Sequence, residues 1–294
     1  MELKACRLCP RRCGAYRSSE KGDGVCKMGA DAVVARAALH FWEEPCLSGT
    51  RGSGTVFFTG CPLGCVFCQN YEISAERAVG KRVTPEELSG IFQRLEEQGA
   101  HNINLVNPTH FAPAIARALR LRRPSVPVVY NSGGYERVET LRSLEGLIDV
   151  YLPDLKYLSP ELSRRYSKAE NYPEAAKAAI AEMLRQTGPA RFDADGMLLR
   201  GTLVRHLILP SNTKNSAEVL RYLAEQNVLV SLMAQYVPCG KAGEYPEINR
   251  RITKREYEKV QELLFSLGLD GYVQERSSAT KDFIPSFRLE GVSP

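Results

Sequence analysis

Residues 60–70 read GCPLGCVFCQN, and the three cysteines of this stretch point to both the fold and the chemistry of the chain. Cys61, Cys65 and Cys68 follow the spacing C-x3-C-x2-C, which supplies three thiolates. An iron–sulfur cluster normally takes four cysteine ligands, so three would leave one iron open to bind another molecule. A structural zinc loop is the alternative, but an unfilled coordination position is typical of catalytic metal sites. The spacing therefore favours a reactive iron–sulfur site.

A second set of cysteines lies within residues 1–29. Cys6, Cys9, Cys13 and Cys26 follow the spacing C-x2-C-x3-C-x12-C. This segment has almost no apolar residues and cannot build a core of its own, so we expect a metal to hold it together. Four thiolates complete a tetrahedral zinc site, and they equally suit an auxiliary iron–sulfur cluster. We therefore predict a small Cys-rich metal-binding extension, with zinc and a second cluster both open.

The length and composition indicate one large domain behind this extension. The chain has 294 residues and is 44% hydrophobic, which is enough for a sizeable core, and residues 30–294 are within the range of α/β barrels. Seven of the nine cysteines fall into the two sets, which suggests metal ligands in a reducing cytoplasm rather than a disulfide framework. The net charge of +5 comes from scattered residues and no apolar run reaches membrane-span length, so we expect neither a nucleic-acid nor a membrane partner.

Short apolar runs alternate with amphipathic stretches from Thr55 onward. Their nearly continuous hydrophobicity is typical of parallel strands that are buried on both faces. Two capping boxes, Thr84 with Glu87 and Thr253 with Glu256, predict helix starts. The pattern predicts an α/β fold, a partial (β/α)6 barrel. The six expected strands are 56–58, 102–106, 126–130, 148–152, 203–209 and 228–233. A further strand is expected before them at 33–39, and Asp195-Gly196 predicts a hairpin turn within 191–205.

Polar side chains follow these apolar runs. In β/α barrels the carboxyl ends of the strands carry the active site, so polar groups from several strands should meet at one mouth. Arg205 and His206 are neighbours on one strand, and only one of them can face the barrel interior. The segments that contribute are 107–110, 131–135, 153–156, 205–206 and 235–236.

The cysteine loop resembles that of the radical S-adenosylmethionine (SAM) superfamily, in which three cysteines hold a [4Fe-4S] cluster and the open iron binds SAM. The Gln69-Asn70 tail, the Asp154-x-Lys156 pair and the Arg205 strand, which ends in Leu209-Pro210, are similar to the activating enzymes of pyruvate formate-lyase. The whole chain is more similar still to an uncharacterised branch of proteins like the activating enzyme of pyruvate formate-lyase. That branch shares the N-terminal cysteine set and the runs 101–110, 129–136 and 148–157, and the resemblance to it covers essentially the full chain. It implies a radical SAM partial barrel with a [4Fe-4S] cluster and SAM as cofactors.

The resemblance also implies roles for individual residues. Asp154, Lys156 and Asn131 match positions that contact SAM in the activating enzymes. Arg205 rather than His206 is expected to face the barrel interior and to bind the cofactor as well. The activating enzymes carry a Gly-Gly-Glu element after the second strand, where this chain has Asn-Pro-Thr-His. We expect Thr109 and backbone carbonyls there to accept the amino group of SAM instead.

The implied activity is radical generation. A reduced cluster would cleave SAM to methionine and a 5′-deoxyadenosyl radical, which abstracts hydrogen from a protein or peptide, for instance to form a glycyl radical. A radical transformation of a small molecule is the alternative enzymatic hypothesis. A non-catalytic iron–sulfur or zinc protein is a third, which the cofactor-binding strand ends disfavour. The low potential of such clusters implies a flavodoxin- or ferredoxin-type reductant as partner.

Overall fold

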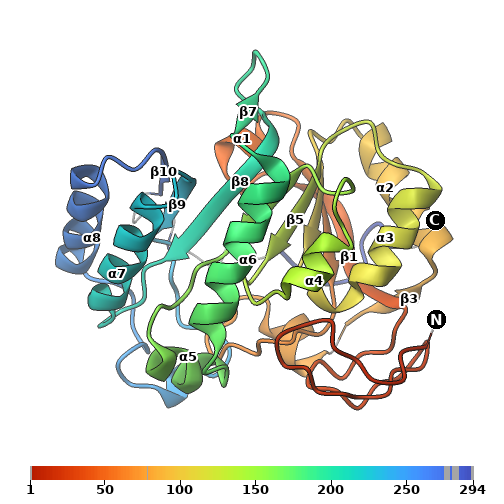
Figure 1. The fold of residues 1–294 in the computed structure, drawn as a ribbon, viewed down its shortest axis with the longest axis horizontal. Coiled ribbons are helices and arrows are strands. Elements are labelled where there is room, and N and C mark those ends of the chain that lie inside the picture. Colours follow the sequence, from red (N-terminus) through yellow and green to blue (C-terminus); the bar gives the residue numbers. More distant parts are fainter. Residues whose placement is uncertain (1, 78, 275–278, 280–284, 293–294) are drawn as a thin grey trace.

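A mostly parallel sheet forms the centre of the computed structural model, which describes residues 2–77, 79–274, 279 and 285–292 (Figure 1). Within these residues the sheet has ten strands, in the order β10-β9-β8-β6-β5-β4-β2-β1-β3, and β7 pairs with β8. All neighbours from β2 to β10 are parallel, whereas β1, β3 and β7 pair antiparallel. This arrangement confirms the α/β prediction.

The six expected strands form the parallel part of the sheet. They are β2 (Ser53–Phe58), β4 (Ile103–Val106), β5 (Val128–Ser132), β6 (Val150–Pro153), β8 (Leu198–Leu207) and β9 (Leu229–Met233).

Four further strands were not among the six. Most residues of β1 (Ala32–His40) are apolar, and the sequence pattern does predict a strand there. The other three, β3 (Lys81–Val83), β7 (Arg191–Phe192) and β10 (Gly271–Val273), are too short to produce an apolar run. An Asp-Gly turn between β7 and β8 gives a two-stranded hairpin, as that dipeptide predicts.

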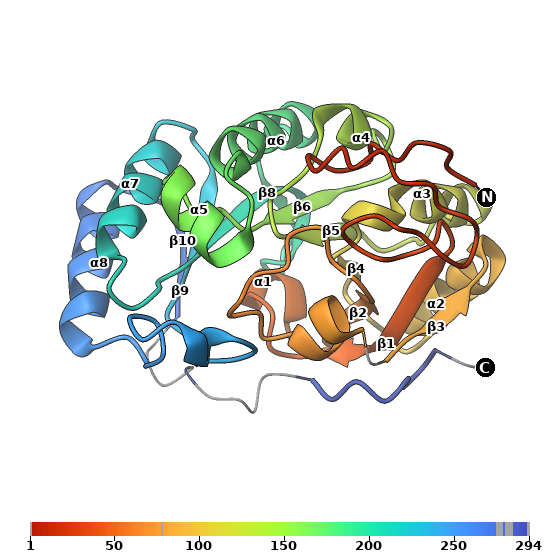
Figure 2. The same ribbon diagram turned by 90° about the horizontal axis from the view of Figure 1, so that it is seen from below.

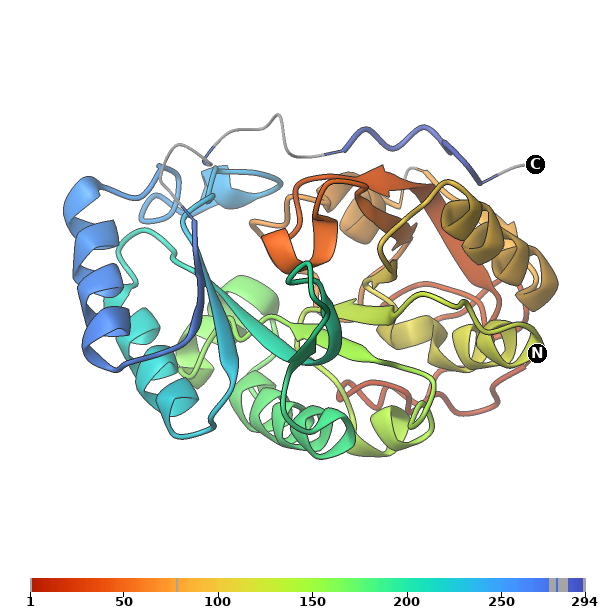
Figure 3. The same cartoon turned by 90° about the horizontal axis from the view of Figure 1, so that it is seen from above.

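The helices cover the outer face of the sheet (Figures 1 and 3). Both predicted capping boxes are present, at the start of α2 (Pro85–Glu97) and of α8 (Lys254–Ser266). No helix of the described part of the chain is long and apolar enough to cross a membrane. The other helices are α1 (Pro45–Ser48), α3 (Ala112–Leu121), α4 (Val138–Arg142), α5 (Pro160–Ser167), α6 (Tyr172–Thr187) and α7 (Thr213–Ala224). Short helical turns lie at η1 (Glu72–Glu76), η2 (Thr109–Phe111) and η3 (Ala242–Glu244).

The two ends of the parallel strands carry different segments. The cysteine loop that follows β2 lies at the carboxyl ends, and the N-terminal segment lies at the same end, beside α3 and α4 (Figure 2). At the opposite end, α1 lies beside the β7–β8 hairpin (Figure 3). Residues 285–292 lie alongside β1, and the Ala37 amide of this strand donates to the Glu290 carbonyl at 2.8 Å. The cysteine sets thus share one end of the sheet.

The N-terminal segment makes specific contacts with the barrel. Thr140 of α4 donates its hydroxyl to the Leu8 carbonyl at 2.7 Å. The Arg17 side chain is 1% exposed, and its guanidinium lies 5.8 Å from the centre of the Phe111 ring. These contacts attach the segment to α4 and to Phe111, the residue directly before α3, in addition to any metal. The domain boundary after residue 29 stays a prediction.

Candidate active site

The cysteine loop presents three sulfur atoms that each accept one hydrogen bond. The Leu63 amide donates to Cys61 Sγ at 3.4 Å. Ser74 Oγ donates to Cys68 Sγ at 3.3 Å, and Ser167 Oγ donates to Cys65 Sγ at 3.1 Å. Hydrogen bonds to sulfur stabilise the thiolate form and tune the potential of a bound cluster. Each of these hydrogen bonds therefore acts to lower the pKa of the cysteine that accepts it.

The surroundings of the thiols fit an iron–sulfur cluster. Burial, together with the neighbouring thiols, raises the pKa of Cys61 to about 12, so a positively charged group is needed to stabilise three thiolates. Burial also raises the pKa of Cys65, but the Lys156 ammonium acts in the opposite direction. Among the described residues no three His, Cys, Asp or Glu side chains are placed to hold a single metal ion. A cluster binds each cysteine through a different iron atom, so its ligands lie farther apart than the ligands of a single metal ion.

A cavity of about 230 Å³ separates this loop from the strand ends. Asn131, Asp154, Lys156 and Arg205 all line it, as do the three cysteines. They reach it from β5, from the segment after β6 and from β8, because parallel strands bring their carboxyl ends to one edge. Four of the five residues predicted to bind SAM are thus brought together opposite the cysteine loop.

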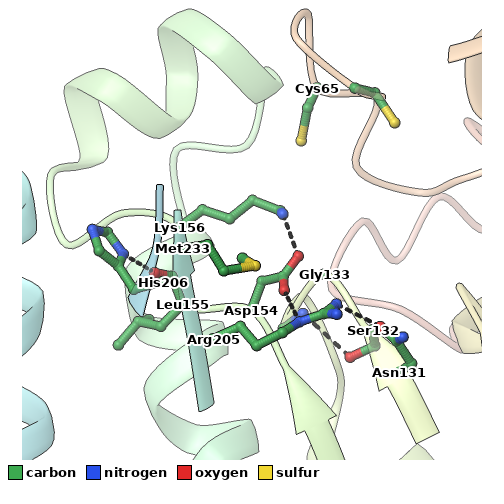
Figure 4. A network of polar contacts seen from close by, with 12 residues as sticks. Cys65, Asn131, Ser132, Gly133, Asp154, Leu155, Lys156, Arg205, His206 and Met233 are labelled. Atoms are coloured by element: carbon green, nitrogen blue, oxygen red, sulfur yellow. Dashed lines mark hydrogen bonds and ion pairs between the residues drawn. The ribbon is translucent and has the colours of Figure 1, made fainter. Parts of the chain in front are cut away.

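A network of charged groups joins the strand ends (Figure 4). Asp154 accepts hydrogen bonds from Lys156 Nζ at 2.5 Å and from Arg205 Nε at 2.9 Å. Arg205 Nη2 also donates to Asn131 Oδ1 at 2.6 Å. Burial alone would raise the pKa of Asp154, but the charges of Arg205 and Lys156 outweigh it and lower that pKa. Asp154 is therefore a carboxylate at neutral pH.

The side chain of Tyr172 holds the backbone around this network in place. The Tyr172 hydroxyl of α6 accepts a hydrogen bond from the Lys156 amide at 2.9 Å. The same oxygen lies 2.9 Å from the Gly133 carbonyl and 2.7 Å from the Asp154 carbonyl. Tyr172 thus connects the segments that follow β5 and β6.

His206 points away from the cavity, as the alternation along β8 predicts. Its Nδ1 lies 2.7 Å from the Leu155 carbonyl, and its Nε2 lies 2.9 Å from Ser216 Oγ. Burial lowers the pKa of His206 to about 4, so the ring is neutral at physiological pH. Tyr236 is likewise packed, with its hydroxyl donating to the Ile248 carbonyl at 2.8 Å.

Thr109 does not line the cavity with the other four candidates, and its role in SAM binding stays a prediction. Its hydroxyl donates to Glu136 Oε1 at 2.6 Å, and both side chains are buried. His110 Nε2 lies 2.8 Å from the Thr59 carbonyl. The segment after β4 contributes Asn107 to the cavity lining instead, with a φ of 60°. A short helical turn begins right after Pro108 and carries Thr109 away, which the sequence pattern alone did not indicate.

Glu43 and Glu44 also line the cavity, and sequence reasoning missed them. Glu43 Oε2 lies 3.2 Å from Arg205 Nη1, and Glu43 Oε1 accepts a weak hydrogen bond from Asn131 at 3.4 Å. Burial raises the pKa of both carboxyl groups, and the Arg205 charge lowers it. Glu43 and Glu44 lie directly before Pro45, between two predicted strands, where charged residues are usual in a surface loop. Two adjacent carboxylates before a helix start were the only sequence feature that could have indicated a role in the site.

The N-terminal cysteines are less uniformly held. Cys6, Cys9 and Cys26 are buried and Cys13 is exposed, and all four are free thiols. Arg17 Nη1 lies 3.6 Å from Cys6 Sγ, and the Arg17 charge lowers the pKa of Cys26 against the larger effect of burial. A buried guanidinium beside buried thiols offsets the negative charge of thiolates.

Comparison with known proteins identifies the family. The sequence model of the radical SAM superfamily matches residues 55–192. An uncharacterised protein of Methanocaldococcus jannaschii is 32% identical over 281 residues, which cover 91% of this chain and 76% of that protein.

Two solved structures have a similar fold. A radical SAM methyltransferase from Sphaerobacter thermophilus has a TM-score of 0.52 at 16% identity, and the match covers 76% of this chain and 66% of that one, just under two thirds. Methylornithine synthase has a TM-score of 0.52 at 14% identity, over 81% of this chain and 72% of that one. At such identities these two structures support the fold alone. The family match over residues 55–192 and the cysteine loop within it lead to one conclusion: the chain belongs to the radical SAM superfamily.

Proposed function

We propose that this radical SAM enzyme generates a radical on a protein or peptide substrate, in the manner of the pyruvate formate-lyase activating enzymes. The observation that carries the proposal is that the three-cysteine loop and the Asp154–Lys156–Arg205 network line the same cavity. When bound, the [4Fe-4S] cluster supplies one electron that cleaves SAM into methionine and a 5′-deoxyadenosyl radical.

The side chains of the cavity have separate tasks in this proposal. Cys61, Cys65 and Cys68 hold the cluster as thiolates. Lys156 pairs with the carboxylate of SAM, and Asp154 accepts hydrogen bonds from its ribose hydroxyls. Asn131 and Arg205 keep Asp154 in place, because Arg205 contacts both of them.

The polar groups near the cavity support a peptide substrate. Gln69, Asn70, Gln235 and Gln274 line it, and an amide side chain donates and accepts hydrogen bonds as a peptide backbone does. Trp42 also lines the cavity and is 59% exposed, so a large aromatic surface is available to a chain that reaches the cavity.

We also propose that Cys6, Cys9, Cys13 and Cys26 hold a metal, either zinc or a second iron–sulfur cluster. Zinc would require these thiols to lie closer together than they do in this structure, whereas a cluster binds each cysteine through a different iron. Three of these thiols are buried, none forms a disulfide, and Arg17 offsets their charge as thiolates. Metal analysis separates the two alternatives, because zinc would be found beside one four-iron cluster, whereas a second cluster would roughly double the iron.

The test of the main proposal is anaerobic turnover with a flavodoxin or ferredoxin reductant. The wild-type protein should convert SAM to methionine and 5′-deoxyadenosine, and the variant with Cys61, Cys65 and Cys68 changed to Ala should not. To find the substrate class, extracts of deuterium-labelled cells are divided by dialysis into large and small molecules. Deuterium that enters 5′-deoxyadenosine from the large fraction supports a protein substrate, and transfer from the small fraction alone contradicts it.

A further inference from the structure

We infer that Arg11, which lies between two N-terminal cysteines, positions the radical SAM cysteine loop, so that the N-terminal segment sets the geometry of the radical site. The inference rests on the proposed role of Cys61, Cys65 and Cys68. Both cysteine sets lie at the same end of the sheet, and the N-terminal segment is drawn in red in Figure 2.

The Arg11 guanidinium is surrounded by four backbone carbonyls from two other segments. Arg11 Nε donates to the Pro62 carbonyl at 2.9 Å, and Nη2 donates to the Leu63 carbonyl at 3.1 Å. Nη2 also donates to the Ser167 carbonyl at 2.8 Å, and Nη1 donates to the Lys168 carbonyl. A planar guanidinium has five N–H donors in a fixed arrangement, so these contacts define the position of the loop in more than one direction.

The carbonyls that Arg11 contacts are next to the sulfur ligands. Pro62 and Leu63 lie between Cys61 and Cys65 in the chain. Ser167 accepts from Arg11 through its carbonyl and donates to Cys65 Sγ through its hydroxyl, so a single residue lies between the guanidinium and a ligand sulfur. Loss of Arg11 would therefore change the backbone near one ligand and the hydrogen bond to another.

A second contact, independent of Arg11, also joins the N-terminal segment to the radical SAM cysteine loop. Gly60, the residue before Cys61, has a φ of 83° and packs against the Met28 side chain and the Cys26 carbonyl. A Cβ atom at Gly60 would lie 3.1 Å from that carbonyl and would overlap Met28 Cγ. The N-terminal segment thus contacts the radical loop on both sides of Cys61, through Met28 at one side and Arg11 at the other.

Arg11 does not line the cavity, so it acts as a positioning residue. The alternative is that Arg11 only attaches the N-terminal segment to the barrel. The alternatives predict different results at the radical site: a positioning role changes the cluster signal and the affinity for SAM, whereas a purely attaching role changes neither as long as the N-terminal metal is retained.

The experiment compares Arg11→Ala with Arg12→Ala in the full-length, anaerobically reconstituted protein. Arg12 is exposed and lies between the same two cysteines, so its variant loses the same charge from the same segment. Metal content, the electron paramagnetic resonance spectrum of the reduced cluster with and without SAM, and the dissociation constant of SAM are measured for both. Arg11→Lys keeps the charge but not the planar set of donors, and serves where Arg11→Ala is insoluble.

We expect Arg11→Ala and Arg11→Lys to alter the SAM-dependent spectrum and to weaken SAM binding roughly tenfold, as loss of a charge-assisted set of hydrogen bonds should. Arg12→Ala should resemble the wild type. An unchanged spectrum and affinity in the Arg11 variants would overturn the inference, as would equal effects of Arg11→Ala and Arg12→Ala.

Hydrogen exchange separates this inference from the proposed function. The amides of residues 61–68 should exchange faster in the Arg11 variants than in Arg12→Ala, whether or not a cluster is present. A wild-type protein without a four-iron cluster would contradict the proposed function. The amide exchange rates of that protein and its Arg11 variants would still show whether Arg11 positions the loop. Equal exchange in all variants would overturn the positioning role.

Discussion

The two cysteine sets of this chain differ in what surrounds their sulfur atoms. In the loop after β2, each of three sulfurs accepts a hydrogen bond, and a charged network lies across the cavity. In the N-terminal set, Cys13 is exposed and the principal charged neighbour is Arg17. The first set has fewer ligands but faces a binding site, and the second has enough ligands to close a metal site. The two sets therefore differ mainly in whether a polar binding cavity lies opposite the sulfur atoms.

The largest expected effect comes from removing one set at a time. Changing Cys61, Cys65 and Cys68 to Ala should abolish the reducible four-iron cluster and leave the metal of the N-terminal set in place. Changing Cys6, Cys9 and Cys26 to Ala should remove the N-terminal metal and expose residues 2–29 to protease, while the barrel stays folded because its core lies elsewhere. Metal analysis, absorbance and limited proteolysis measure both results. Loss of both metals from either variant would show that the sets are not separate.

Next in size is the effect on SAM binding. Lys156→Ala and Asp154→Ala should weaken it by on the order of 1.5–3 kcal/mol, about tenfold or more, because each removes a charge-assisted contact. The iron content should not change, since neither residue is a ligand. Isothermal titration with SAM measures the affinity, and Lys259→Ala, an exposed lysine of α8 outside the cavity lining, is the control. Unchanged affinity in both cavity variants would remove these residues from the site.

A glycine pair tests the junction between the two regions. Gly60 and Gly64 lie in the same loop, with φ values of 83° and 68°. A Cβ atom would meet the N-terminal segment at Gly60 but would meet nothing within 4 Å at Gly64. Each change to Ala costs about 1–2 kcal/mol for the left-handed backbone, and Gly60→Ala adds on the order of 1–3 kcal/mol for the overlap with Met28. Urea unfolding should therefore show Gly60→Ala as the less stable variant. Equal stabilities would mean that the junction is loosely packed.

The smallest expected effect is on the pH dependence of stability. His110 lies beneath the junction, near Arg17, and burial lowers the pKa of His110 from 6.5 to about 3. The unfolded chain therefore binds a proton below pH 6.5 that the folded chain does not, and stability falls as the pH decreases. Between pH 7 and 5.5 this histidine should remove roughly 1.3 kcal/mol from the free energy of unfolding. The free energy of unfolding, measured in urea at several pH values, should depend less on pH in His110→Gln than in the wild type. An unchanged pH dependence would contradict the role given to His110.

Much of the parallel sheet could be predicted from the sequence, because its strands are apolar runs and the helix starts carry capping boxes. The sequence also predicts that Asn131, Asp154, Lys156 and Arg205 lie close together, because the carboxyl ends of parallel strands meet at one edge of the sheet. The short strand β10 (Gly271–Val273) was missed because three residues give no periodicity.

The places where the structure departs from the expected site have causes that can be traced to particular residues. Thr109 follows a strand as the other candidates do, but a helical turn directs its hydroxyl to Glu136. Glu43 and Glu44 reach the cavity from the loop before α1, and their approach depends on tertiary packing that no local pattern encodes. Arg11 was one of several basic residues in a polar segment, and its four carbonyl partners lie more than fifty residues away in the chain.

The hydroxyl of Tyr172 has a consequence for how this site can change during evolution or in the laboratory. A single oxygen atom lies within hydrogen-bonding distance of backbone groups of Gly133, Asp154 and Lys156, so those three positions cannot drift independently. A redesign of the segment after β5 that aims at a new substrate would also displace the ammonium group that faces the cysteine loop. Substrate range in this scaffold is therefore easier to alter from the β1–α1 and β9 sides, which Tyr172 does not touch.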